Sequence, residues 1–298
     1  MEENKKVTIA AHSGGFHCDD IFAVATLLIL LKDSDVTIVR TRDLDMINTA
    51  DYVVDVGGTH DAEKKRFDHH QIGGAGKREN GIPYASFGLV WKEYGEMLCG
   101  NSKTALKIDT MMVQPIDAHD NAVPFMNATI PGLFPFDVYT LNYIFTPTWK
   151  EESVNLDDVF VKLVSYAKMI LERAIVSVSA SIEGEEFVID SYEKAKDKRF
   201  IEVNQNHPWE EVLLRYPEPL FVIYQRSDGR WSMKRVPKSM LSFEPRKNFP
   251  EAWAGKSDEE LEKVTGVGDV IFCHNNRYII VAKTKESILK LAEIALNS

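Results

Sequence analysis

Histidine and aspartate side chains gather in four short patches within the first 120 residues. The patches are His12 with His17, Asp19 and Asp20; Asp55; Asp68 with His69 and His70; and Asp117 with His119 and Asp120. Six of the eight histidines lie in or beside these patches. Imidazole nitrogens and carboxylate oxygens suit manganese or magnesium, with iron, cobalt and zinc as alternatives. The set is large enough for two divalent ions about 3.5 to 4 Å apart, which generate hydroxide and clamp a phosphoryl oxygen.

Asp55 follows an apolar run, residues 52–54. A carboxylate at that position should be buried, and an unpaired buried carboxylate is costly unless a metal ion or a donor compensates its charge.

Two features of the first patch suggest no chemistry of their own. Gly14 and Gly15 lack the spacing of a nucleotide-binding loop, so no nucleotide cofactor is expected. Cys18 has no orienting partner pattern and is expected as a small buried residue that faces away from the site.

The elements that must position these residues alternate between β-branched runs and helix-period segments. This pattern predicts an α/β fold with a doubly wound, mostly parallel sheet in the N-terminal lobe. The predicted strands are 7–11, 36–41 and 52–56, and the predicted helices are 20–32, 44–50, 86–98 and 104–114. The carboxyl ends of parallel strands meet at one crevice, so patches that follow different strands can converge there. The glycine-rich stretch 73–83 is expected as a loop or flap over that edge.

The chain is expected to divide into three parts. Residues 1–150 form the metal-binding catalytic domain, 151–199 a helical linker with an interruption near Gly184, and 200–298 a smaller substrate-binding α/β domain. In the last part, two strand pairs (220–225 with 231–236, and 270–274 with 277–282) and a closing helix (286–297) are predicted. Residues 226–247 hold seven cations against two acids, which indicates either a phosphate-facing patch or a solvated hairpin.

Composition sets the broad class. The 298 residues carry 35 Lys and Arg against 45 Asp and Glu, a net charge of −10, which excludes a generally basic nucleic-acid coat protein. Apolar residues make up 44%, enough for a sizeable core. No apolar run approaches the roughly 18 residues of a membrane span, and the polar N-terminus lacks a signal-peptide pattern. Three scattered cysteines fit reduced thiols. The expected location is the cytoplasm, or the nucleus or mitochondrion if the source is eukaryotic.

Four motifs carry a specific resemblance. They read HSGGFHCDD at 12–20, VDVGG at 54–58, RFDHHQ at 66–71 and IDAHDN at 116–121. In order and spacing they resemble the motifs of the DHH phosphoesterase superfamily, which is metal-dependent and RecJ-like. More narrowly, they resemble the melanocyte-proliferating-gene exonuclease family, from whose first motif Ser13 and Asp20 depart. Similar segments continue downstream at 145–149, 236–238, 242–246, 250–253 and 271–274, so the resemblance covers nearly the whole chain.

The resemblance implies a role for each residue of the motifs. One ion would be held by His12 and His17, the other by Asp19, His69 and Asp117, with Asp55 as the bridging, catalytic carboxylate. His70 would contact the phosphate, and Asp68 would orient a neighbouring histidine, a partner that metal-binding imidazoles generally need. Asp120 is the second choice as the ligand from the fourth motif. In the second lobe the expected substrate-binding residues are Arg246, His274, Asn275 and Lys283.

The activity implied is that of a two-metal phosphodiesterase that trims RNA from an end in the three-prime to five-prime direction, with manganese preferred over magnesium. Two alternatives remain open. One is a hydrolase of small phosphoesters, such as short oligonucleotides, nucleotide phosphates or pyrophosphate. The other is a non-catalytic, metal-stabilised module that binds nucleic acid. The expected partner is RNA or another phosphodiester, and a dimer is one option for the oligomeric state.

Overall fold

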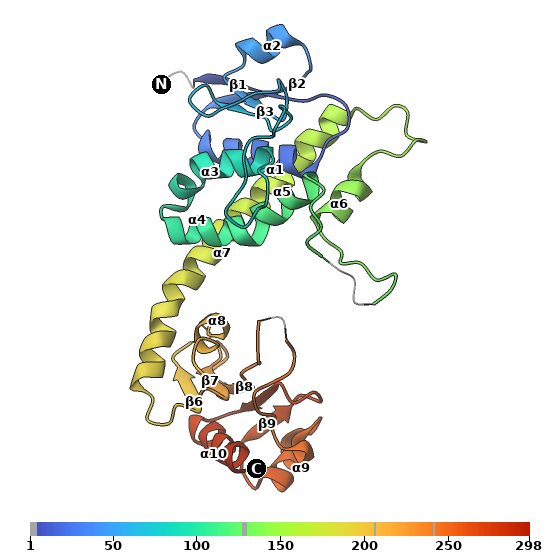
Figure 1. The fold of residues 1–298 in the computed structure, drawn as a ribbon. Coiled ribbons are helices and arrows are strands. Elements are labelled where there is room, and N and C mark those ends of the chain that lie inside the picture. The colour runs from blue at the N-terminus through green and yellow to red at the C-terminus, as the bar shows by residue number, and fades with distance from the viewer. Residues whose placement is uncertain (1–4, 127–129, 206, 241) are drawn as a thin grey trace. The chain divides into compact units, whose positions relative to one another are not determined.

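The computed structural model describes residues 5–126, 130–205, 207–240 and 242–298 (Figure 1). The chain divides into two compact units, Met1–Ser179 and Ala180–Ser298. Each unit contains one five-stranded sheet. The boundary falls inside the helix that spans residues 156–194. The helical linker expected at 151–199 is therefore divided between the two units. Among the described residues, no helix is both long and apolar enough to cross a membrane.

The sheet of the first unit has the strand order β2-β1-β3-β5-β4. Its strands are β1 (Lys6–Ala11), β2 (Asp35–Arg40), β3 (Tyr52–Val54), β4 (His60–Asp61) and β5 (Arg66–Phe67). The first four strands in this order run parallel, and only β4 pairs antiparallel, with β5. The register places Ala11 beside Val54 and Val54 beside Phe67. The residues that follow β1, β3 and β5 therefore leave the sheet side by side at one edge.

Helices cover both faces of this sheet, which confirms the doubly wound architecture. The helices of the unit are α1 (Cys18–Leu30), α2 (Leu44–Thr49), α3 (Ser86–Cys99), α4 (Ser102–Ile108), a π-helical segment (Asp109–Val113), α5 (Gln114–Asp120) and α6 (Val138–Phe145), of which α1, α2 and α3 lie on the sheet. Ile47 of α2 packs with Ala10 and Val53 on one face. On the other face α1 lies against α3 (Figure 1). The rings of Phe22 and Phe87 are 5.4 Å apart between these two helices. The apolar character of α1 on all sides follows from this sandwiched position.

Helix α7 (Leu156–Lys194) runs for 39 residues without a break, so the interruption predicted near Gly184 is wrong. A single glycine within a helix costs only about 1 kcal/mol relative to alanine, too little to end a helix that is held by packing. Here the glycine makes room for a neighbour. A Cβ atom at Gly184 would lie 2.8 Å from Cδ of Pro208.

The sheet of the second unit has the order β6-β7-β8-β10-β9. Its strands are β6 (Phe200–Val203), β7 (Phe221–Gln225), β8 (Trp231–Arg235), β9 (Val270–Cys273) and β10 (Ile279–Ala282). The helices of this unit are α8 (Glu210–Leu213), a 3-10 turn (Glu251–Trp253), α9 (Asp258–Thr265) and α10 (Lys285–Asn297). Both predicted strand pairs are confirmed as antiparallel. One face of the sheet packs on α9 and α10, and the other on α8 and the end of α7.

Candidate metal centre

The carboxyl edge of the parallel sheet gathers the predicted residues of unit 1. His12 follows β1, Asp55 follows β3, and the triplet 68–70 follows β5. Asp19 and Asp20 lie in the first turn of α1, which starts from the same edge. The sheet topology therefore brings together patches that are more than 50 residues apart in sequence, as the alternation of strands and helices predicts.

The start of α1 is fixed by its own polar residues. His17 is the N-cap, and its backbone N–H donates to Oδ1 of Asp20 at 3.1 Å, so that the two residues form a capping box. The loop before the helix is held by Arg40, which donates to the carbonyl oxygens of Gly14 and Gly15 at 2.8 and 3.3 Å. Sequence reasoning missed this role of Arg40, whose guanidinium also lies 4.7 Å from the ring of Phe160.

Asp55 lies at the middle of the cluster, and its two oxygens face different histidines. Oδ2 is 3.3 Å from Nε2 of His12, whereas Oδ1 is 3.3 Å from Nε2 of His69 and 3.4 Å from Nδ1 of His70. The backbone φ of Asp55 is 56°, in the left-handed region that few residues other than glycine adopt. Strain of this kind persists only where the surrounding structure imposes it, and it is typical of functional sites.

Asp120 completes the cluster from the end of α5. Its Oδ2 is 3.1 Å from Nε2 of His69, and its Oδ1 is 3.9 Å from Nδ1 of His17. Among the residues that the structure describes, three sets of side chains have ligand atoms close enough to hold an ion: His12, His17 and Asp55; Asp55, His69 and His70; and His17, Asp19 and Asp120. Asp55 and His17 each belong to two sets. The geometry thus offers adjoining sites that share ligands.

Burial and charge show why a cation fits here. Asp19 and Asp20 are fully buried and Asp55 is 3% exposed, so three carboxylates share one enclosed space. Within the described part of the chain, four buried atoms of the cluster make no hydrogen bond of good geometry: Nε2 of His12, Oδ1 of Asp19, Oδ2 of Asp20 and Nε2 of His69. Two of them, Nε2 of His12 and Oδ2 of Asp20, face each other at 2.9 Å. Uncompensated buried carboxylates are strongly unfavourable. Divalent cations bound by these oxygen and nitrogen donors would neutralise the buried negative charge and would give the four atoms a partner. The residues therefore fit the predicted metal ions.

The pKa values of the metal-free cluster reflect the same crowding. Burial, followed by the charges of Asp55 and Asp120, raises the pKa of Asp19 well above its usual range. Burial on its own lowers the pKa of His69, but hydrogen bonds to Asp120 and Asp55 together with their charges outweigh it and raise the pKa to about 10. A proton on His69 therefore offsets part of the negative charge of these carboxylates.

Asp68 holds His70 in place. Its Oδ1 lies 2.8 Å from Nδ1 of His70 and accepts from the backbone N–H of His70 at 3.0 Å, while Oδ2 accepts from the N–H of Gly58. Burial raises the pKa of Asp68, but these hydrogen bonds outweigh it and leave the pKa below its ordinary value. The ionised carboxylate can therefore hold the ring of His70 in one orientation, as expected of a residue that orients a neighbouring histidine.

Asp117 does not lie in the cluster. Its Oδ2 accepts from Nη1 of Arg78 at 2.7 Å, its Oδ1 accepts from the backbone N–H of Gly88 at 3.0 Å, and it belongs to none of the three ligand sets. Burial raises the pKa of Asp117 to about 7, against the opposing effect of Arg78. Because α5 turns these two acids in different directions, the geometry favours Asp120 over Asp117 as the ligand from the fourth motif.

Ser86 is the other residue that sequence reasoning missed. It is fully buried at the first position of α3. Its hydroxyl donates to Oδ1 of Asp55 at 3.0 Å, and its backbone N–H donates to Oδ2 of Asp19 at 3.3 Å. Ser86 thus contacts two of the predicted ligands at once. A serine at the predicted start of a helix was the only signal in the sequence, and that signal indicates an N-terminus, not a site.

The substrate residues predicted in unit 2 have mixed surroundings. Arg246 donates to the backbone carbonyls of Leu214, Tyr216 and Pro219, so its guanidinium is used within its own unit. The remaining predicted residues are His274, which is partly buried, with Asn275 and Lys283, which are exposed. Nδ1 of His274 accepts from the N–H of Asn276 at 3.0 Å.

The basic segment 226–247 is partly neutralised. Arg226 and Arg230 both pair with Asp228, and Lys238 pairs with Glu244. These contacts favour the solvated-hairpin interpretation for those three cations.

Cys18 is buried, and its thiol lies 3.7 Å from the carbonyl oxygen of Val138. Burial, aided by the neighbouring acids, raises the pKa of the thiol far above its ordinary value. A thiol in this environment stays protonated and is a poor nucleophile. The environment of Cys18 matches the expectation of a small buried residue.

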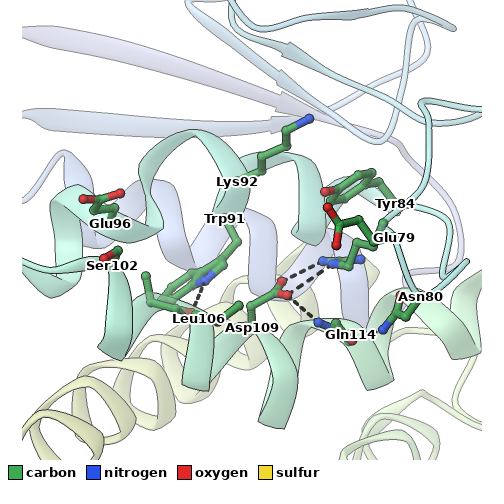
Figure 2. A pocket seen from close by; sticks show the side chains of 12 residues that line it. Glu79, Asn80, Tyr84, Trp91, Lys92, Glu96, Ser102, Leu106, Asp109 and Gln114 are labelled. Carbon is green, nitrogen blue, oxygen red and sulfur yellow. Dashed lines mark hydrogen bonds and ion pairs between the residues drawn. The ribbon is translucent and has the colours of Figure 1, made fainter. Parts of the chain in front are cut away.

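A separate cavity of about 510 Å³ lies in unit 1 beside α3, α4 and the π-helical segment. Figure 2 shows its wall, where Asp109 accepts hydrogen bonds from Arg78 and from Gln114. Trp91, which also lines the cavity, donates to the carbonyl oxygen of Ala105 at 3.1 Å. None of the residues in the three ligand sets lines this cavity. It is therefore distinct from the candidate metal centre, although Arg78 contributes to its lining.

The fold and the cluster together define an α/β protein with a candidate metal centre at the carboxyl edge of a parallel sheet. The sequence profile of the family MYG1_exonuc, described as "Uncharacterised protein family (UPF0160)", matches residues 8–296. The chain therefore belongs to this family.

Relatives in several eukaryotes are similar over almost the whole chain. A human protein named MYG1 exonuclease is 28% identical across 97% of this chain and 85% of its own length. A Dictyostelium discoideum protein named MYG1 protein is 30% identical across 98% of this chain and 97% of its own length. Among solved structures, RecJ from Thermus thermophilus in complex with Mn²⁺ aligns with 98% of this chain and about half of its own (52%), at 13% identity and a TM-score of 0.29. That structural similarity is too low to support an inference.

Proposed function

We propose that this protein is a metal-dependent phosphodiesterase that acts as an exonuclease. The observation that carries the proposal is the position of Asp55, whose two oxygens divide between His12 on one side and His69 and His70 on the other. A carboxylate that faces two sets of ligands is what a bridged pair of ions requires. The names of the relatives add the nuclease activity, which the cluster alone does not specify.

The residues that would hold two ions follow from one ligand set and from the acids around His69. His12, His17 and Asp55 form one of the sets and would hold one ion. Oxygens of Asp19, Asp55 and Asp120 lie 3.8, 3.3 and 3.1 Å from Nε2 of His69, and these four residues would hold the other ion. The chemistry that such ions supply when bound is a water molecule of lowered pKa and positive charge for the phosphoryl oxygens. His70, held by Asp68, is 58% exposed at its side chain and is free to contact the phosphate. Donors of this kind without thiolate favour manganese, with magnesium as the alternative.

The substrate we propose is RNA, trimmed from its three-prime end. This follows from the family resemblance of the four motifs and from the exonuclease name of the human relative. We also propose the cytoplasm as the location.

The test is hydrolysis of end-labelled RNA by the purified protein with manganese, magnesium or zinc. A five-prime label should reveal a ladder that shortens from the three-prime end. Asp55→Ala should abolish the ladder while the circular dichroism spectrum is retained. Asp228→Ala, which removes an exposed acid in unit 2, is the control and should leave the activity intact. Near-normal hydrolysis by Asp55→Ala would refute the proposal.

A hydrolase of short phosphoesters is the second candidate, and the net charge of −10 favours it because a long polyanion is repelled by an acidic protein. Substrate length separates the two. If kcat/KM falls steeply from a dinucleotide to longer RNA, the short-substrate function is correct. Tight binding of RNA by the manganese-loaded protein, with no cleavage of either substrate, would instead indicate the non-catalytic module.

A further inference from the structure

An exposed aromatic surface lies in the segment that includes α6. Its members are Phe134, Phe136, Tyr143, Phe145 and Trp149, with 77, 69, 82, 44 and 84% of their area exposed. Helix α6 itself contains no buried residue. Scattered exposed hydrophobic residues are normal, but several exposed aromatic rings within one short segment mark a candidate interaction site. We call these five residues the aromatic surface.

Helix α6, which carries two of these residues, is attached to the elements of the candidate metal centre. Nδ2 of Asn142 donates to the carbonyl oxygen of Phe16, next to His17, at 3.3 Å. The hydroxyl of Tyr139 donates to the carbonyl oxygens of Pro115 and Ile116 in α5, and the Tyr139 ring stacks on His119 at 3.5 Å. The helix therefore contacts Phe16 and His119, which directly precede two candidate ligands, His17 and Asp120.

Charge distinguishes this segment from the rest of the protein. Residues 130–149 contain one charged side chain, Asp137, in a chain that is 27% charged. The carboxylate of Asp137 caps α6, because it accepts hydrogen bonds from the N–H and hydroxyl of Thr140. Lys150 follows immediately, with its ammonium 5.1 Å from the centre of the Trp149 ring. Glu151, whose carboxylate accepts from the N–H and hydroxyl of Thr148, and Glu152 come directly after Lys150. Three acids therefore stand against one lysine over residues 130–152, so the aromatic rings, and not the net charge, are what the segment offers to a nucleic acid.

We propose that the aromatic surface binds the unpaired bases of a single-stranded nucleic acid by stacking, beside the metal centre that cleaves its end. The inference rests on the proposed function and specifies its substrate as single-stranded. Aromatic rings accept every base because each base has a π face, so such a surface grips a strand without reading its sequence. The side chain of His17, 61% exposed, leaves the metal centre open to solvent next to this segment.

Tryptophan fluorescence gives a direct measurement. Trp149 is almost fully exposed, whereas Trp91, Trp209 and Trp253 are 3% exposed or less, and Trp231 is partly buried. Stacking on a base should therefore quench the emission of Trp149 selectively. We expect a ten-nucleotide oligoadenylate, added in EDTA so that no cleavage occurs, to quench the protein. Polyphosphate of equal charge should not, and Trp149→Phe should remove most of the quenching.

Affinity and kinetics test the energetic role. Tyr143→Ala and Trp149→Ala should each weaken binding of the labelled oligoadenylate by about tenfold, measured by fluorescence anisotropy. They should raise KM for single-stranded RNA and leave hydrolysis of bis(p-nitrophenyl) phosphate with manganese unchanged. Val161→Ala, a substitution of an exposed apolar residue on α7 outside the aromatic surface, is the control and should leave the affinity unchanged.

The results that would overturn the inference are distinct from those that would overturn the proposed function. Unchanged affinity in both alanine variants, equal binding of duplex, or equal quenching by polyphosphate would each refute stacking. If light scattering shows a dimer that Trp149→Ala converts to a monomer, the surface binds a second copy of the chain instead. Failure of the wild-type protein to hydrolyse any phosphodiester with manganese would refute the proposed function, whereas the binding measurement in EDTA would stand independently.

Discussion

Ser86 offers the sharpest test of the candidate metal centre, because a single hydroxyl contacts the proposed bridging carboxylate. Ser86→Ala removes the donor to Oδ1 of Asp55 at 3.0 Å but keeps the backbone N–H that reaches Asp19. The change adds no atoms, and Ser86 is fully buried, so water does not replace the lost donor. The substitution therefore isolates one contact to the carboxylate.

The magnitude follows from the kind of hydrogen bond that is lost. A hydrogen bond to a charged group contributes roughly 1.5–3 kcal/mol. Since about 1.4 kcal/mol corresponds to a factor of ten in an equilibrium constant, we expect the affinity for manganese to fall by about 10- to 100-fold. The same range is typical when a partner of a metal ligand is removed.

The assay is isothermal titration calorimetry with manganese, supported by electron paramagnetic resonance to count the bound ions. Ser86→Thr, which restores a hydroxyl, should recover part of the affinity. Ser232→Ala is the matched control, because Ser232 is also fully buried but lies in β8 of the other unit. If Ser86→Ala binds manganese as tightly as the wild type, the role of Asp55 as a bridging ligand supported by Ser86 is wrong.

Three further predictions concern the same unit. Gly88→Ala should destabilise the protein by about 3–5 kcal/mol in urea unfolding. The added Cβ would lie 1.8 Å from Oδ2 of Asp117 and would break the buried pair of Asp117 with Arg78. Unchanged stability would contradict that geometry. Asp120→Asn should lower manganese affinity at least about tenfold. Asp117→Asn should lower thermal stability more than manganese affinity. If calorimetry shows that Asp117→Asn loses manganese affinity and Asp120→Asn keeps it, Asp117 is the ligand. Because the pKa of His69 is raised to about 10 in the metal-free protein, its contribution to stability is full below its unfolded pKa near 6.5 and is lost as the pH rises through 10. Manganese must displace that proton, so its affinity should rise between pH 6 and 9 with proton uptake by the buffer, and a flat profile would contradict this assignment.

The parts of the fold that could be predicted from sequence are those set by local patterns. Alternating strands and helices predicted the parallel sheet, and the turn-forming residues predicted both hairpins of unit 2. Asp55 was expected to be buried because it ends an apolar strand, and it is 3% exposed. Topology then explains why the patches converge, since parallel strands that lie side by side end at the same edge.

The parts that could not be predicted depend on contacts between distant residues. The choice between Asp117 and Asp120 depends on Arg78, which is 39 residues away from Asp117 and donates to it. The continuity of α7 through Gly184 depends on Pro208, which packs against the helix from outside it. In each case the partner carries no signal in the spacing of the sequence.

The left-handed backbone of Asp55 restricts which residues can occupy that position at all. Among residues with side chains, aspartate, asparagine and histidine adopt this conformation most readily. Asparagine lacks the negative charge, and histidine has no carboxylate whose two oxygens could face two ions. Glutamate, which keeps the carboxylate, is disfavoured by the backbone. Chain geometry and coordination chemistry thus select the same amino acid independently, so a search for functional substitutes at this position should find almost none.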